Sequence, residues 1–386
     1  MRTIIIKNAA VFLATVLCLC SIHAFSQGFT HSGLFRKFIS NKKDTVRRSS
    51  FFPFPTGSIS PETGLEYGVA AMYSFYTDKK DANTRVSTIN ILGTHTTKNQ
   101  TGLKLVSDIW SKQNKYHYYE EFRYRNYPYS FYGIGGNTVA ADKDGVDEKR
   151  ARLAFAADKK ILNHYYIGIQ AAFEDYVERD KNPAGLLTTG NYYGNTGGKQ
   201  IYFGIEQLYD SRNNVTYTTK GWYGNLLIAY TPDFFGGNNF HGAFVNFDGR
   251  YFTPVSSKIT LGINGIYQGI YAKNIPFYLL PQMGSMNMMR GYYQGRFRDK
   301  DLAAMQAELR YRFIPRLAVA AFGGYGTVWG ENDFSFNILK PEYGLGIRYF
   351  FDLGKDLSIR FDYGIGQKLP GEKRMSGFYF SMMEAF

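Results

Sequence analysis

The chain has 386 residues, a formal net charge of +13 and a mean hydropathy of −0.30. Both cysteines, Cys18 and Cys20, lie near the amino-terminal end, so the rest of the chain offers no thiol for a disulfide, a nucleophile or a metal site. No apolar run of about 18 residues follows residue 26, which excludes helical membrane spans. The basic residues are spread along the chain, so nucleic-acid binding is not expected.

Residues 1–26 have the pattern of a secretory signal peptide. Arg2 and Lys7 form a basic start, residues 9–20 are almost wholly apolar, and small residues precede Gln27. Two alternatives fit less well. A membrane anchor needs a longer apolar run, and a lipoprotein signal needs a small residue before its cysteine, where this chain has leucine. The pattern therefore predicts export.

Residues 27–50 are polar and basic without a clear period, and we expect them to form a periplasmic tether or a short plug. From 51 to 386 the pattern changes to apolar and polar residues in alternation, which predicts strands. In the segment 357–366 one face is wholly apolar and the other is charged or small. This suits a barrel wall between lipid and a wet lumen.

The alternation recurs often enough for a large barrel. Similar segments are centred near Val69, Ile89, Leu105, Phe122, Leu153, Ile169, Phe203, Leu226, Phe247, Ile263, Leu309, Val319 and Ile347, and another ends the chain. With the segment 357–366 these make fifteen, and a short segment at 51–54 supplies a sixteenth, which satisfies the even strand count of bacterial barrels. We therefore predict an all-β fold: a transmembrane antiparallel barrel of sixteen strands.

The connections are predicted to alternate in length, as they do in outer-membrane barrels. Those at 111–115, 254–258, 314–315 and 352–356 are short, and those at 178–197, 274–299 and 330–340 are long. Counted along the predicted strands, every long connection falls on the same side. This regularity is an independent argument for the barrel.

The last residues form an aromatic strand. Phe378, Phe380, Met382 and Phe386 are predicted to share one face, with Glu384 as a charged exception near the membrane interface. A terminal strand of this kind is similar to the signal by which assembly machinery recognises outer-membrane barrels, through edge pairing and alternate side-chain pockets.

A long segment before the twelfth strand is more specific. It reads Met288-Met289-Arg290-Gly291-Tyr292-Tyr293 and resembles the Arg-Gly-aromatic tip of the loop that folds into the lumen in the BamA/TamA-like superfamily, the bacterial surface antigen family. The next segments resemble the same family, as does a turn near 210–221, which matches the one after its eighth strand. The resemblance covers about residues 200–386 well, and the rest by pattern only.

The resemblance implies roles for the loop tip. Arg290 would enter the lumen and pair with acidic wall residues, with Glu308 as the first candidate and Asp362 as the second. Gly291 would give the tight tip its backbone freedom, and the aromatic Tyr292 would follow it. One departure stands out, because the family usually has an acid where this chain has Gly324.

The resemblance also implies insertion, assembly or export of outer-membrane proteins, with lipid, the assembly machinery, client barrels or a periplasmic partner as partners. The segment between the predicted signal peptide and the first strand is expected to be too short for the family's periplasmic POTRA modules, so a partner is expected to supply docking. A passive anion-favouring pore lined by Arg310, Arg312, Arg348 and Arg360, or a structural surface barrel, remains the alternative. A lipid-acting enzyme is a third reading, but no histidine pair has ligand spacing, so no enzyme, metal or cofactor is expected.

Overall fold

The computed structural model describes residues 47–331, 333–354, 356–382 and 384–386. The predicted signal peptide, and all but the last four residues of the predicted tether, lie outside the described residues. In the part of the chain that is described, no helix combines the length and apolar character needed to cross a bilayer.

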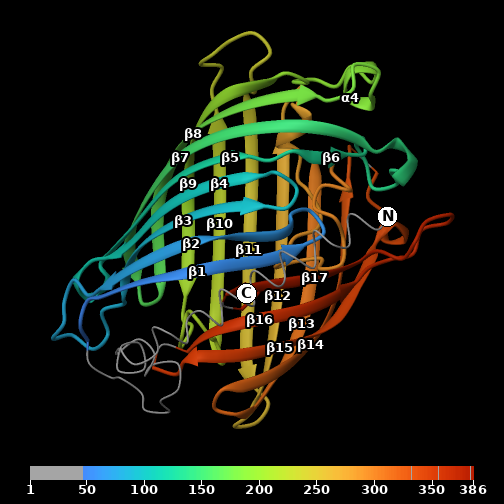
Figure 1. The fold of residues 1–386 in the computed structure, drawn as a ribbon. Helices are drawn as coiled ribbons and strands as arrows, with labels where there is room; N and C mark the ends of the chain where they lie inside the picture. The colour runs from blue at the N-terminus through green and yellow to red at the C-terminus, as the bar shows by residue number, and fades with distance from the viewer. Residues whose placement is uncertain (1–46, 332, 355, 383) are drawn as a thin grey trace, which may run out of the picture.

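The described residues form one antiparallel barrel of sixteen long strands, which confirms the predicted fold class (Figure 1). The strands are β1 (Ser50–Ser60), β2 (Gly64–Phe75), β3 (Ser87–Thr96), β4 (Thr101–Trp110), β5 (Tyr116–Asn126), β7 (Asp144–Leu162), β8 (Tyr165–Asp180), β9 (Gly197–Asp210), β10 (Gly221–Thr231), β11 (Gly242–Pro254), β12 (Ile259–Tyr271), β13 (Asp301–Ile314), β14 (Leu317–Trp329), β15 (Lys340–Asp352), β16 (Leu357–Ile365) and β17 (Ser376–Met382). Each pairs with the next along the chain, and β17 returns to β1.

Short elements lie in the connections. A three-residue strand, β6 (Tyr129–Phe131), pairs only with β7 and extends the wall at one end. The helical pieces are η2 (Lys112–Asn114), η3 (Ala140–Asp142), α4 (Leu186–Thr189), η4 (Phe277–Leu279) and η5 (Phe336–Ile338). None of them forms a layer over the barrel.

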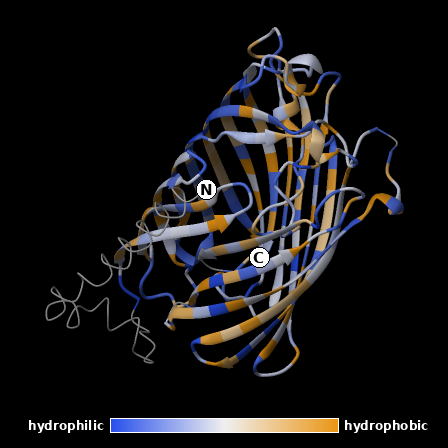
Figure 2. Cartoon of the chain, turned by 45° about the vertical axis from the view of Figure 1, so that its right-hand side comes forward, coloured by the Kyte–Doolittle hydropathy of each residue, from blue (hydrophilic) through white to orange (hydrophobic). Residues whose placement is uncertain are grey.

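The alternation in the sequence becomes the two faces of the wall. Along β13, Met305 and Leu309 point outward and are exposed, whereas Gln306, Glu308 and Arg310 point inward and are buried. The other strands follow the same period, so apolar and polar residues alternate along each ribbon in Figure 2. An apolar outer face around a polar lumen is the pattern of a barrel that spans a membrane.

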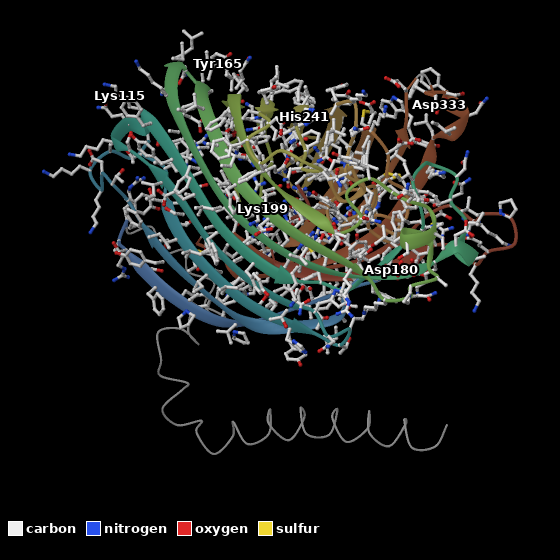
Figure 3. The ribbon with its side chains drawn as sticks, turned by 90° about the horizontal axis from the view of Figure 1, so that it is seen from above. Lys115, Tyr165, Asp180, Lys199, His241 and Asp333 are labelled. Atoms are coloured by element: carbon white, nitrogen blue, oxygen red, sulfur yellow. The ribbon has the colours of Figure 1, made fainter. Side chains whose placement is uncertain are left out.

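The connections named from the sequence sort to the two ends of the barrel as predicted. The long connections 181–196, 272–300 and 330–339 all lie at one end of the barrel, and Figure 3 shows Asp180 far from Tyr165, at the opposite ends of β8. We call these ends the loop end and the turn end.

A strict alternation of short and long connections is wrong, since the loop-end connections 61–63 and 97–100 are short. Two turn-end connections, 76–86 and 211–220, are at least as long as 330–339. The second places Tyr217 inside the barrel mouth, against Phe350.

The barrel closes unevenly. β1 and β17 lie side by side (Figure 1), but among the described residues they share a single register pair, Ile59 with Phe380. On its other edge β1 pairs with β2 through eleven residues, and β17 pairs with β16 through seven. The ladder between the first and last strands is therefore the weakest in the wall.

Candidate functional site

The connection between β12 and β13, residues 272–300, folds back into the barrel, and we call it the lumenal loop. Its side chains Met283, Met289, Tyr292 and Phe297 are buried in a cluster with Leu302 and Val328 of the wall. Most of the lumen wall is polar, so the position of the loop depends on specific polar contacts as well as on this cluster.

Arg290 is the centre of those contacts. Its Nη1 donates to Glu308 Oε2 at 3.0 Å and to Asp362 Oδ2 at 2.6 Å, and all three side chains are fully buried. The two carboxylates come from β13 and β16, so one guanidinium joins strands that are not neighbours. The structure thus brings together the arginine and both acids named from the sequence. A charge-assisted pair of this kind is directional and holds the loop in one place.

Three further residues complete the contacts of Arg290, and sequence reasoning missed them. Its Nη2 donates to Gln306 Oε1 at 3.0 Å, and its backbone N–H donates to Glu342 Oε2 at 2.5 Å. Its guanidinium also lies 3.3 Å from the centroid of the Phe322 ring, as in a cation–π contact.

Glu342 supplies an acid close to Gly324, the position where the resemblance implies an acid and this chain has glycine. The two residues are directly opposed across the β14–β15 ladder, so an acid stands one strand away from the position where the resemblance implies one. Glu342 is buried beneath the loop. Continuing the alternation of 343–351 by one step would have placed Glu342 inward, but the register across the long connection 330–339 is not readable from the sequence.

The residues after Arg290 fix the tip. Gly291 has φ +104°, and a Cβ there would lie 2.8 to 3.0 Å from backbone atoms of residues 364–366, so only glycine fits. The Tyr292 hydroxyl donates to the Pro341 carbonyl at 2.7 Å and accepts from the Gln367 N–H at 2.9 Å. Burial raises the pKa of Tyr292 above its ordinary value, which keeps this donor protonated.

The loop also reaches the seam between the first and last strands. The Gly291 N–H donates to the Tyr379 hydroxyl of β17 at 2.8 Å. The Gln294 N–H donates to Glu62 Oε1, in the turn between β1 and β2, at 2.5 Å. The lumenal loop therefore contacts both sides of the weakest ladder at the loop end.

A second group of arginines lies below Arg290, toward the turn end. Arg310 contacts Glu308 at 2.8 Å, and Arg348 contacts Glu384 at 2.9 Å and also pairs with Asp362. The Arg360 guanidinium donates to the Met286 carbonyl of the loop at 2.9 Å. These cations are almost completely buried and ion-paired or hydrogen-bonded.

This arrangement corrects the basis of the pore alternative. Arg310, Arg348 and Arg360 do not line an open path, because each is at most 1% exposed and contacts acids or the loop. Arg312 is partly exposed, but it pairs with Asp356 at the turn end at 2.9 Å. The lumenal loop and these arginines belong to one buried network of contacts. The alternation of residues along a strand could not predict this network.

The predicted single face of the last segment is wrong in part. Phe378 is exposed on the outer face and Phe380 is half-buried, whereas Phe386 is buried in the lumen beside Phe252. β17 includes Met382, whose side chain lies outside the description, and ends there. Beyond the strand the chain turns inward, because the Glu384 carboxylate pairs with Arg348 instead of lying at the membrane interface.

Among the described residues there is no group of three or more histidine, cysteine, aspartate or glutamate side chains that could hold a metal ion. The site consists of buried ion pairs and hydrogen bonds that hold the lumenal loop against one half of a membrane-type barrel.

The fold matches that of solved BamA and CdiB barrels. The chain resembles BamA from Haemophilus ducreyi, in a form lacking POTRA domains 1–3, with TM-score 0.59 and 15% identity over 87% of this chain and 70% of that one. It also resembles CdiB from Acinetobacter baumannii (TM-score 0.56, 12% identity, 87% and 59%) and CdiB from Escherichia coli (TM-score 0.55, 11% identity, 85% and 62%). The chain thus spans about three fifths of each CdiB protein.

The family follows from the sequence match. Residues 58–386 match the Omp85 superfamily domain, and the chain belongs to this superfamily. No curated protein is similar enough in sequence to match. The resemblance to the BamA/TamA-like family, stated from the loop tip and the strands around it, is confirmed.

Proposed function

We propose that this barrel inserts, assembles or exports proteins at the outer membrane, by opening the seam between β1 and β17. The observation that carries the proposal is the single register pair, Ile59 with Phe380, at the only weak ladder found among the described strands. An unpaired strand edge offers backbone donors and acceptors to an incoming strand. The family match supports a role of this class.

The lumenal loop supports the proposal in a second way. It fills the lumen beside β13–β17 and contacts Tyr379 and Glu62 on the two sides of the seam. In this proposal the loop holds the loop end of the closed seam in order, and the seam opens on the side of the loop that faces the turn end. The chain would work with membrane lipid, with client barrels and with a periplasmic partner for docking, and it would act without covalent catalysis.

A disulfide across the seam tests this proposal. Ile59→Cys with Phe380→Cys joins the two strands at their one shared pair, and the chain after residue 26 has no other cysteine to interfere. In cells depleted of the wild type, we expect the crosslinked variant to reproduce a selective loss of other outer-membrane barrels or surface proteins, measured by quantitative mass spectrometry. A reductant should restore them.

The control shares one substitution. Ile59→Cys with Leu65→Cys joins β1 to β2, a ladder that is already continuous, and it should leave the other outer-membrane proteins unchanged. If depletion of the protein itself leaves the outer membrane unaltered, the assembly role is wrong. If the seam crosslink has no effect while depletion does, the role stands and the seam mechanism is wrong.

A further inference from the structure

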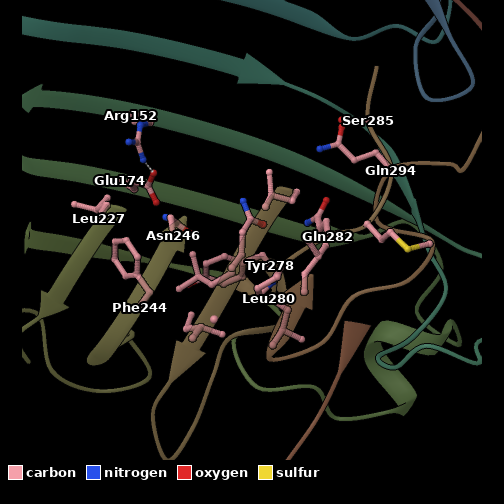
Figure 4. A pocket seen from close by; sticks show the side chains of 18 of the residues that line it. Arg152, Glu174, Leu227, Phe244, Asn246, Tyr278, Leu280, Gln282, Ser285 and Gln294 are labelled. Atoms are coloured by element: carbon pink, nitrogen blue, oxygen red, sulfur yellow. Dashed lines mark hydrogen bonds and ion pairs between the residues drawn. The ribbon is translucent and has the colours of Figure 1, made fainter. Parts of the chain in front are cut away.

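The lumen is not filled evenly, and the half lined by β5–β12 holds a cavity of about 610 Å³ beside the lumenal loop. Figure 4 shows Arg152 and Glu174 on one side of this cavity and Phe244, Tyr278 and Leu280 on another. Its volume is within the range of sites that take small ligands. The strands of the seam do not line it, but the lumenal loop does, including Gln294, whose N–H contacts Glu62 beside the seam. Ligand binding here goes beyond the proposed function, and it is measured without any readout of the seam.

One wall of the cavity is a square of four arginines. Arg123 on β5 is directly opposed to Arg152 on β7, and Arg125 is directly opposed to Arg150 on the same two strands. Like charges placed directly opposite across a ladder are destabilising. All four line the cavity, and Glu174 is the one acid among the described residues that line it.

Two of the four arginines pair with acids that lie outside the cavity. Arg123 contacts Glu121 at 2.8 Å and Arg125 contacts Glu148 at 2.5 Å, but neither acid lines the cavity. The four arginine side chains are 17–33% exposed. Arg150 and Arg152 pair with Glu174, which does line the cavity. Arg123 and Arg125 are therefore the arginines of the square that line the cavity while an acid outside it compensates them.

Another wall carries several apolar side chains, with Asn246 and Gln282 among them. The apolar side chains are those of Phe240 and Phe244 of the β10–β12 region and of Leu279, Leu280 and Met283 of the lumenal loop. Gln200 also lines the cavity and is 5% exposed; its Nε2 donates to Glu174, while its Oε1 has no hydrogen-bond partner. A buried acceptor without a partner is costly, and a phosphate that keeps one proton can donate to it.

We propose that this cavity binds an amphipathic phosphate, with the phosphate on the arginine square and the apolar body against Phe244 and Leu280. A guanidinium matches phosphate oxygens in a bidentate way. Several guanidiniums suit a phosphate better than a single carboxylate, because a phosphate carries more oxygens and more charge. The ligand chemistry is shared by lipid head groups and by free phosphate compounds, and a pair of probes with and without an alkyl chain separates them.

The test uses the full chain purified in zwitterionic nanodiscs and titrated by calorimetry with octyl phosphate and with inorganic phosphate. We expect octyl phosphate to bind more tightly than inorganic phosphate, and to bind less tightly as salt is raised. In Arg123→Gln with Arg152→Gln, its affinity should fall about tenfold or more, since charge-assisted hydrogen bonds are lost. Glu121 keeps Lys104, and Glu174 keeps Arg150, so the fold has partners left for both acids.

Two matched variants make the result decisive. Arg250→Gln removes another lumen arginine, paired with Asp248 and outside the cavity, and it should leave binding unchanged. Phe244→Ala should weaken octyl phosphate but not inorganic phosphate, which tests the apolar contacts even if the double variant fails to fold. Equal binding by the wild type and the double variant overturns the site. Equal affinity for the two probes overturns the amphipathic ligand and leaves a simple phosphate site.

Discussion

Arginines face the lumen in both halves of this barrel, and in both they stand directly opposite one another across a ladder. Arg348 opposes Arg360 in the β15–β16 wall, and Arg123 opposes Arg152 in the β5–β7 wall. The first pair is fully buried under the lumenal loop, among the acids Asp362 and Glu384. The second pair is partly open to a cavity.

The difference lies in what covers the arginines, not in the strands that carry them. In the β13–β17 half, the loop brings its own cation, Arg290, between the acids Glu308 and Asp362 of the wall, and all three side chains are fully buried. A buried network of charges is costly to disturb, because any carboxylate that loses its partner stays buried. In the β5–β12 half, the loop contributes apolar side chains and leaves space in front of the cations.

The largest expected loss of stability is in the β13–β17 half, where Arg290 fixes the lumenal loop; we call this the locked half and the β5–β12 half the open half. Arg290→Ala removes the cation shared by Glu308 and Asp362, and we expect the free energy of unfolding to fall by about 3–5 kcal/mol, the usual result of breaking a buried pair. The measurement is the urea dependence of the folded band on semi-native gels, together with proteolysis of the loop. Arg250→Ala, whose pair with Asp248 is partly exposed, should change stability by about 1 kcal/mol or less.

A smaller effect is expected at the loop tip. Gly291→Ala places a Cβ against backbone atoms near Gly366 at a positive φ, so the loop must move, and we expect a loss of about 2–3 kcal/mol by the same urea titration. Gly93→Ala is the matched control, because a Cβ there meets nothing within 4 Å. If both glycines tolerate alanine equally, the tip is not held as the structure indicates.

The smallest change in stability is expected in the open half. Arg123→Gln with Arg152→Gln should cost about 1 kcal/mol or less, since both side chains are partly exposed and both acids keep another cation. The urea midpoint of this variant, set beside that of Arg290→Ala, measures the contrast between the halves. A loss as large as that of Arg290→Ala would mean that the arginine square is structural, as the locked half is.

The strand alternation was sufficient to predict most of the wall. A period of two needs no distant partner, so the outward Met305 and Leu309 and the inward Glu308 and Arg310 follow from residues 305–313 alone. The same period and the sorted connection lengths predicted the sixteen strands and the two ends. The motif at 288–293 also led to Arg290, Glu308 and Asp362 as residues that come together.

Only the tertiary structure decided what the inward face does. Glu342 and Gln306 are partners of Arg290, and Phe386 lies in the lumen. Arg310 is buried and does not line a pore. In each case a loop or a chain end from a distant part of the sequence folds over the residue. The square at Arg123 and Arg152 likewise depends on register across the connection 127–143, which alternation does not specify. A period of two tells which side of the wall a residue faces. What it meets there depends on closure of the barrel, because closure brings distant segments into one lumen.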